Sequence, residues 1–182
     1  FPINIVTVPT LGPLEEKETV LNSSYVAQSS KTRLAHRMLR NIWLNKSDDE
    51  FEKFRILIEE TWPDMSIEKS EIQNHNDLVM YCKENRINRE IYWAGFGFHI
   101  WLQILTHLLG ADSATTIIID EPDIYLHPDL QHRLLHQLKS MNKQILLATH
   151  SVEIINEAEQ DEIVLVDKTL KRAKRINDIE GL

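Results

Sequence analysis

Two hydrophobic periods occur along this chain, and the way they alternate changes near residue 90. After that point, short continuous apolar runs alternate with stretches in which apolar residues recur every three or four positions. The continuous runs indicate buried strands, and the longer period indicates amphipathic helices. The order α-β-α-β-α-β over residues 91–182 therefore predicts an α/β fold, with a parallel sheet and right-handed crossovers.

The two halves of the chain carry different sets of predicted elements. In the second half we expect a helix at 98–109 ended by Gly110, a strand around Ile117, a helix at 129–141, a strand around Ile145, a helix at 152–158 and a strand at 162–166. In the first half, which is mixed α+β, we expect a strand at 3–9, a loop or weak helix start at 19–30, helices at 31–44 and from the capping box at 47–50 to Trp62-Pro63, a hairpin of 65–71 and 77–83, and a strand or loop entry at 89–93. We accordingly predict an arm or subdomain over 1–90 and a separate core region over 91–182.

Length and composition favour a globular protein with one full core. The chain has 182 residues, of which 42% are hydrophobic and 26% charged. It contains no apolar stretch long enough for a membrane span and no recognisable signal peptide. Its one cysteine, Cys82, cannot form an internal disulfide, which fits a reducing compartment. A cytoplasmic location is expected.

The formal charge of −8 argues against strong electrostatic binding of nucleic acid by this chain alone. The stretch 168–175 is locally basic, and we interpret it as a solvated, linker-like segment rather than a phosphate-contacting patch. The chain opens on Phe1 and closes without an evident helix cap. Both ends are expected to be cuts through a longer protein.

Polar side chains follow two of the predicted strands where each strand ends. The run 115–119 ends in Asp120-Glu121, and the run 144–149 ends in His150. An aspartate at a rigid strand tip suits Mg²⁺, which takes one or two carboxylates together with waters and phosphate oxygens. Glu121 could accept a hydrogen bond from an attacking water, and His150 could contact a γ-phosphate oxygen. Either feature alone also fits a solvent-exposed strand end or a structural histidine, but their joint occurrence favours a catalytic site.

These residues resemble known ATPase motifs. The run from Ile117 to Pro122 resembles a Walker B motif with its catalytic glutamate, and 148–151 resembles the switch histidine of ABC-type ATPases. The linking residues 123–128, with His127, are similar to a D-loop of the RecF/SMC-like branch, and within it of the overcoming-lysogenization-defect (OLD) group. The resemblance covers about 91–168.

That resemblance implies a P-loop NTPase-like fold, ATP and Mg²⁺ as cofactors, and a homodimer that sandwiches the nucleotide. It also implies a link to DNA processing, repair or phage defence, and no membrane partner. His127 would act across the dimer. Gly95 and Gly97 stand where the family has its signature, which caps the partner's nucleotide. The signature serine is absent here, and a glycine-hinged entry to a buried helix is the alternative interpretation.

A phosphate-binding loop is missing from the chain. None of its five glycines fits the pattern G-x-x-x-x-G-K-[ST]. The resemblance places that loop in a lobe before Phe1, so the chain would be the C-terminal part of the ATPase core, incomplete and inactive when isolated. A nucleotide-independent dimerisation or interaction module with a vestigial site is the alternative function. The nucleotide domain of a membrane transporter is disfavoured by His127.

Three further features have a chemical and a structural interpretation. His132 and His136 have the spacing of a metal pair, but we favour an exposed helix face. The aromatic residues Trp93, Phe96, Phe98 and Trp101 could stack on bases, but we favour core packing. The basic helix 31–40 could contact DNA or a partner, but we favour a solvated face.

Overall fold

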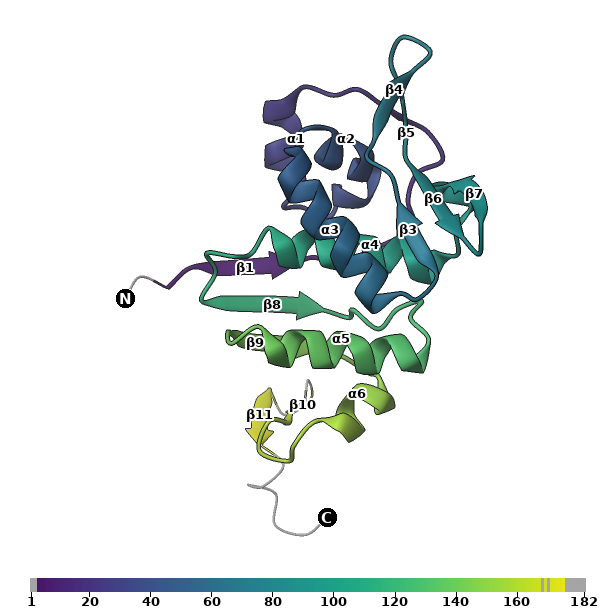
Figure 1. The fold of residues 1–182 in the computed structure, drawn as a ribbon. Helices are drawn as coiled ribbons and strands as arrows, with labels where there is room; N and C mark the ends of the chain where they lie inside the picture. Colours follow the sequence, from purple (N-terminus) through teal and green to yellow (C-terminus); the bar gives the residue numbers. More distant parts are fainter. Residues whose placement is uncertain (1–2, 168, 170, 176–182) are drawn as a thin grey trace.

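A three-stranded parallel sheet in the order β1-β8-β9 lies at the centre of the fold (Figure 1). The computed structural model describes residues 3–167, 169 and 171–175. The strands are β1 (Ile5–Val8), β8 (Thr116–Asp120) and β9 (Gln144–Ala148). Ile117 lies between Val6 of β1 and Ile145 of β9 in the register. The predicted α/β fold with a parallel sheet and flanking helices is confirmed.

One face of this sheet is more fully buried than the other among the described residues. Successive residues of a strand point to opposite faces, and the residues of one face all belong to the core or pack against it: Val6, Val8, Ile117, Ile119, Ile145 and Leu147. The same core contains Leu105 of α4 (Phe96–Leu109) and Leu134 of α5 (Pro128–Ser140). On the opposite face, Ile5 is 55% exposed and Leu146 is 51% exposed. The described residues therefore cover the sheet on one side more fully than on the other.

Helix α4 is apolar around most of its circumference, and other elements surround it on most sides. Trp101 and Leu102 on it are fully buried. Helix α3 (Asp48–Thr61) packs beside α4 and begins at the predicted capping box, in which Ser47 and Glu50 bond each other's backbone N–H. The predicted ends of both helices agree with the structure to within two residues.

The remaining elements lie mostly in the first half of the chain and at its C-terminal end. They are α1 (Ser23–Ser29), η1 (Ala35–Arg37), α2 (Leu39–Leu44), η2 (Ile91–Trp93), α6 (Val152–Glu157), β2 (Glu18–Thr19), β3 (Met65–Ile67), β4 (Glu71–Gln73), β5 (Asp77–Val79), β6 (Tyr81–Glu84), β7 (Ile87–Glu90), β10 (Val164–Asp167) and β11 (Arg172–Arg175). The predicted hairpin is confirmed but is shared by two small antiparallel sheets, β2-β5-β4 and β3-β6-β7. Strands β1 and β8, which come from the two sides of residue 90, lie in one sheet. The domain boundary proposed at residue 90 stays a prediction.

The prediction of one continuous helix over 31–44 is wrong. The chain forms η1 and then α2, and between them Met38 leaves the helical region with φ −143° and ψ 27°. This break allows Met38, Leu39 and Arg40 to be buried together. Arg40 therefore lies in the interior, and the expected basic outer face does not include it.

The predicted third strand of the parallel sheet pairs elsewhere. Strand β10 is antiparallel to β11, and among the described residues the outer edge of β9 has no partner strand. The basic segment 168–175 thus contributes a strand rather than only a linker, although β11 is exposed throughout. Lys168, Leu170 and the C-terminal end at 176–182 lie outside the described residues.

Acidification is expected to destabilise the protein through His107 at the end of α4. Burial lowers the pKa of this imidazole from 6.5 to about 4. Between these values the unfolded chain binds the proton and the folded chain does not, so the free energy of unfolding falls as pH drops. A loss of roughly 2–3 kcal/mol is expected from pH ~6.5 to ~4. Urea unfolding at several pH values should show it.

The matched comparison is His107→Leu against His136→Leu, since His136 is exposed on α5. The first variant should lose this part of the pH dependence and the second should keep it. Equal pH dependence in both variants would contradict the assignment.

Candidate functional site

The ends of the three parallel strands bring four polar side chains to one edge of the sheet. Parallel strands end on the same side, so the residues after β1, β8 and β9 become neighbours. The hydroxyl of Thr10, two residues after β1, donates to Oδ2 of Asp120 at 3.0 Å. Across the other pair of strands, Nε2 of His150 lies 3.6 Å from Oε1 of Glu121. Two separate contacts thus join three strand ends.

The two adjacent carboxylates face different neighbours. Asp120 is the last residue of β8, and its side chain turns towards β1 and Thr10. Glu121 has a φ of 46°, and its backbone N–H donates to the carbonyl oxygen of Ala148 at 2.9 Å. A left-handed conformation at a non-glycine residue costs on the order of 1 kcal/mol. This backbone reversal directs the Glu121 side chain towards β9 and His150.

The backbone beneath these side chains is fixed by partly buried hydrogen bonds. The hydroxyl of Thr149 donates to Oδ1 of Asp123 at 2.5 Å and accepts from the backbone N–H of Ser151 at 2.9 Å. The Ser151 hydroxyl donates to Oε1 of Gln131, whose amide donates to the carbonyl of Leu126 at 2.8 Å. The loop after β8, the start of α5 and the turn after β9 therefore form one hydrogen-bonded unit.

By contrast, the tips of the site are open to solvent. The side chain of His150 is 92% exposed, and that of Glu121 is 39% exposed. Contacts between exposed charged groups contribute little to stability. These side chains are accordingly free to exchange their mutual contact for a bound ligand.

The glycine segment, residues 94–97, lies against the loop that follows β8. Gly95 is the N-cap of α4 and makes no side-chain cap bond. Among the described residues, the backbone N–H groups of Phe96 and Gly97 have no acceptor. A Cβ atom on Gly97 would lie 3.1 Å from the carbonyl oxygen of Tyr125, whereas one on Gly95 would meet nothing within 4 Å. The rings of Phe96 and Tyr125 are also in contact, with centroids 5.7 Å apart. Close packing thus requires glycine at 97 but not at 95.

His127 is placed apart from the carboxylates. It is the N-cap of α5, and its Nδ1 lies 3.5 Å from Oδ2 of Asp129. Its side chain is 73% exposed. Within the described part of the chain, no hydrogen bond or ion pair joins it to Asp120, Glu121 or His150. A role for His127 in this chain's own site is therefore not supported by contact, and its role across a dimer stays a prediction.

Comparison with known proteins agrees with this arrangement. The family model described as "AAA domain, putative AbiEii toxin, Type IV TA system" matches residues 13–156. The chain belongs to this AAA-domain family. The family is a nucleotide-binding ATPase-like class.

Individual relatives match this AAA domain over different shares of their own length. The uncharacterized protein MJECL43 of Methanocaldococcus jannaschii is 31% identical over 106 residues, which are 57% of this chain but only 27% of that protein. A structure from work on ATP-driven dimerization and DNA-stimulated activation of SMC ATPases has a TM-score of 0.59 at 15% identity, over 74% of this chain and 86% of that one. An Smc head bound to the C-winged helix domain of ScpA has a TM-score of 0.53 at 14% identity, over 76% and 49% of the chains. These likenesses establish the fold of an SMC ATPase head.

No helix among the described residues is long and apolar enough to span a membrane.

The aromatic residues around α4 of the AAA domain divide into two groups. Phe98 and Trp101 are buried in the core, as predicted from helical spacing. Trp93 is 68% exposed and Phe96 is 51% exposed, so the prediction of core packing is wrong for them. The amino end of α4 therefore carries exposed rings beside the glycines.

The two histidines of α5 lie in different surroundings. The imidazole of His132, on α5, faces α6. Its Nδ1 lies 3.2 Å from Oε1 of Glu157, and its Nε2 lies 3.6 Å from Oε2 of Glu153. His136 is exposed. Across the described residues, no three metal-binding side chains gather at one point.

Sequence reasoning did not single out Thr10, Asp123 or Thr149. Thr10 had a detectable signal, because it follows the apolar run of β1 as Asp120 follows that of β8. The contact between Asp123 and Thr149 gives no such signal, since it joins residues 26 positions apart across a loop.

Removal of the Thr149 hydroxyl should destabilise the AAA domain more than removal of the Thr10 hydroxyl. Thr149→Val leaves the partly buried N–H of Ser151 and a carboxylate oxygen of Asp123 without partners, at a cost of about 1–3 kcal/mol. Thr10→Val is the matched control, because its hydrogen bond to Asp120 is exposed. Urea unfolding of both variants measures the difference. Equal losses would show that the loop is not held by Thr149.

Proposed function

We propose that this chain supplies the metal-binding and water-activating half of a Mg-ATP hydrolysis site, and that a P-loop lobe outside the chain supplies the other half. The observation that carries this proposal is the meeting of Asp120, Glu121 and His150 at one edge of a parallel sheet. The activity belongs to the longer ATPase of the OLD/RecF/SMC-like group, and the isolated chain is inactive.

The residues at the strand ends fit the needs of a magnesium ion. Asp120 is exposed, and among the described residues only its Oδ2 atom accepts a hydrogen bond, from Thr10. Its Oδ1 atom is thus available for a ligand. Magnesium is usually held by one or two carboxylates, with waters and substrate phosphates completing the shell, so Asp120 with a Thr10 hydroxyl beside it fits. A bound Mg²⁺ would neutralise charge on the β- and γ-phosphates.

Glu121 and His150 are placed to act on the attacking water. In our proposal the Glu121 carboxylate accepts a hydrogen bond from that water and orients it in line with the γ-phosphorus. His150, 3.6 Å from the carboxylate, donates a hydrogen bond to a γ-phosphate oxygen. Hydrogen bonds from fixed donors to developing charge commonly provide the largest part of such catalysis.

One sequence feature and two structural features support a separate phosphate-binding lobe. The chain lacks a P-loop, and among the described residues the outer edge of β9 has no partner strand. In addition, Ile5 and Leu146 are exposed on the less covered face of the sheet. An open strand edge beside an apolar face is a surface that proteins normally cover. The missing lobe would pair with β9 and cover this face.

A second copy would complete the nucleotide site. Gly95 and Gly97 present the amino end of α4 next to the loop of Tyr125, and a helix amino end favours an anion. We propose that they bind the γ-phosphate held by the partner subunit, with His127 contacting the partner across the interface. Coupling of the resulting dimer to DNA processing, repair or phage defence is part of this proposal.

Hydrolysis should depend on Glu121. In the complete ATPase, Glu121→Gln is expected to lower the rate by about 10²–10⁴-fold, because the amide cannot take the proton of the water. Steady-state ATP hydrolysis measures this. Glu153→Gln is the matched control, since Glu153 also faces a histidine on the surface. If the complete protein hydrolyses ATP and Glu121→Gln does not slow it, the assigned base is wrong. A complete protein without any ATPase activity would instead favour the interaction-module function.

The 182-residue chain on its own should not bind ATP. Without a P-loop, no set of backbone N–H groups surrounds the β-phosphate, and the net charge of −8 disfavours a polyanion. Calorimetric titration of the chain with Mg-ATP should show no binding at micromolar concentrations. A micromolar dissociation constant would refute the division of the site between two lobes.

A further inference from the structure

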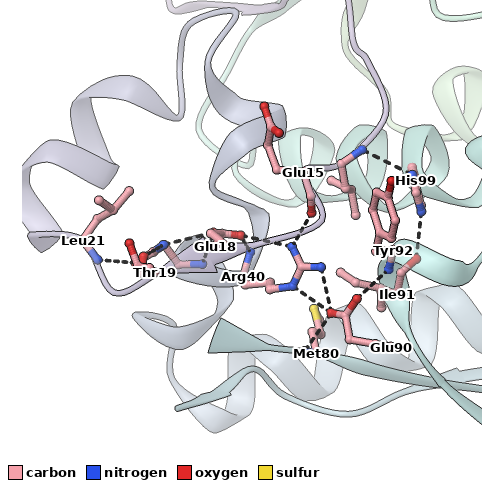
Figure 2. Close-up of polar contacts among 12 residues, drawn as sticks. Glu15, Glu18, Thr19, Leu21, Arg40, Met80, Glu90, Ile91, Tyr92 and His99 are labelled. Carbon is pink, nitrogen blue, oxygen red and sulfur yellow. Dashed lines mark hydrogen bonds and ion pairs between the residues drawn. The ribbon is translucent and has the colours of Figure 1, made fainter. Parts of the chain in front are cut away.

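An arginine in the protein interior is linked through Glu90 to the turn that precedes the glycine segment. Arg40 of α2 is 1% exposed. Burying a guanidinium is costly unless its charge is matched by partners. Its Nε donates to Oε1 of Glu90 at 2.8 Å, whereas its Nη2 lies 2.8 Å from the same oxygen as an ion pair and makes no hydrogen bond among the described residues. Its Nη1 donates to the carbonyl of Glu15 at 3.1 Å and lies 3.6 Å from Glu18 (Figure 2).

Glu18 of β2 holds the helix that carries this arginine. Its carboxylate accepts from the backbone N–H groups of Arg40 and Asn41 at 2.9 and 2.8 Å, and from the Asn41 amide at 3.0 Å. The first turn of α2 is thereby held by a buried acceptor. Burial raises the pKa of the Glu18 carboxyl, opposed by these hydrogen bonds.

Glu90 attaches the arginine to the turn that precedes α4. The backbone N–H of Met80 donates to its Oε1 at 3.2 Å, and the N–H of Tyr92 donates to its Oε2 at 2.8 Å. Glu90 is thus the N-cap of η2. After η2 the chain passes directly through Ala94 to Gly95, the N-cap of α4.

His99 holds the same turn from the side of α4. Its Nδ1 accepts from the backbone N–H of Leu14 at 3.2 Å, so its proton is on Nε2, which lies 2.8 Å from the carbonyl oxygen of Ile91 and donates to it. Burial lowers the pKa of this imidazole, which keeps it neutral. The short turn η2 is therefore fixed at the N–H of Tyr92 by Glu90 and at the carbonyl of Ile91 by His99.

We propose that Arg40 and Glu90 are positioning residues that hold the glycine segment 94–97 in place for a phosphate. Arg40 acts through Glu90: it neutralises and orients the carboxylate that caps η2, and η2 sets where α4 begins. This inference rests on the proposed function only for the identity of the ligand. The structural step, from Arg40 to the amino end of α4, can be tested on the chain itself.

Hydrogen exchange of the 182-residue chain tests the structural step. Arg40→Lys keeps the charge but lacks the Nε–H that donates to Glu90, and Arg40→Met removes both the charge and the donor. Exchange at Tyr92, and at Phe98 and His99, whose N–H groups donate to the carbonyl of Gly95, should become about tenfold faster in Arg40→Met and less so in Arg40→Lys, while α5 amides stay unchanged. Arg55→Met is the control, since Arg55 is ion-paired with Glu52 and Glu59 but on the outer side of α3.

If amide exchange became faster in α5 by the same factor as in α4, the proposal would be overturned, because the substitution would then have destabilised the whole chain. If Arg40→Met does not fold, Arg40→Lys and Glu90→Gln decide the question by the same comparison. No change at Tyr92 in either of them would also overturn it.

The functional step is tested in the complete ATPase. With Glu121→Gln present to prevent hydrolysis, ATP-dependent association should weaken about tenfold in Arg40→Met, with partial recovery in Arg40→Lys. In the background that retains Glu121, the KM for ATP should rise more than kcat falls. Unchanged association in a protein that hydrolyses ATP through Glu121 would refute the positioning role and leave the proposed function standing. Absence of any ATP hydrolysis would refute the proposed function, and the exchange experiment would still decide the structural step.

Discussion

Packing of one sheet face against α4 and α5 is the contact on which the other features of this molecule depend. The residues Val8, Ile117 and Ile119 belong to the same core as the helices, so their side chains must stay on that face. A shift of one residue in any strand would turn its apolar side chains outwards. The register is therefore fixed, and with it the point at which each strand ends. Thr10, Asp120 and His150 become neighbours because of packing that none of them takes part in.

The candidate site combines a fixed base with accessible tips. Partly buried hydrogen bonds around Thr149 and Gln131 hold the loops, whereas His150 extends into solvent. This division suits a site whose ligand arrives with another protein surface, since the side chains keep their places and lose little hydration before binding. The left-handed backbone at Glu121 belongs to the same arrangement, because it separates two adjacent carboxylates towards different strands.

Fold likeness and family membership support different parts of the functional argument. The SMC ATPase structures share 14–15% identity with this chain and therefore establish its fold only. The family match over 13–156 establishes the AAA-domain class. The roles proposed for individual residues are argued from the geometry at the strand ends, and the proposed partner lobe from the missing P-loop and from the edge of β9, which has no partner strand among the described residues.

The sequence by itself determined the local elements and the chemistry of the strand ends. Apolar runs located β8 and β9, the capping residues located the start of α3, and Asp120, Glu121 and His150 followed from their positions after the strands. These features depend on residues close together in the chain. Only the tertiary structure decided that β1 joins β8, that β10 pairs with β11, and that Arg40 is buried. The first and the last depend on contacts between distant segments, since an arginine on a helix has the same local pattern whether it faces water or Glu90. The pairing of β10 is local, but an apolar strand fits equally well against any open edge, so the sequence pattern did not distinguish β11 from β9.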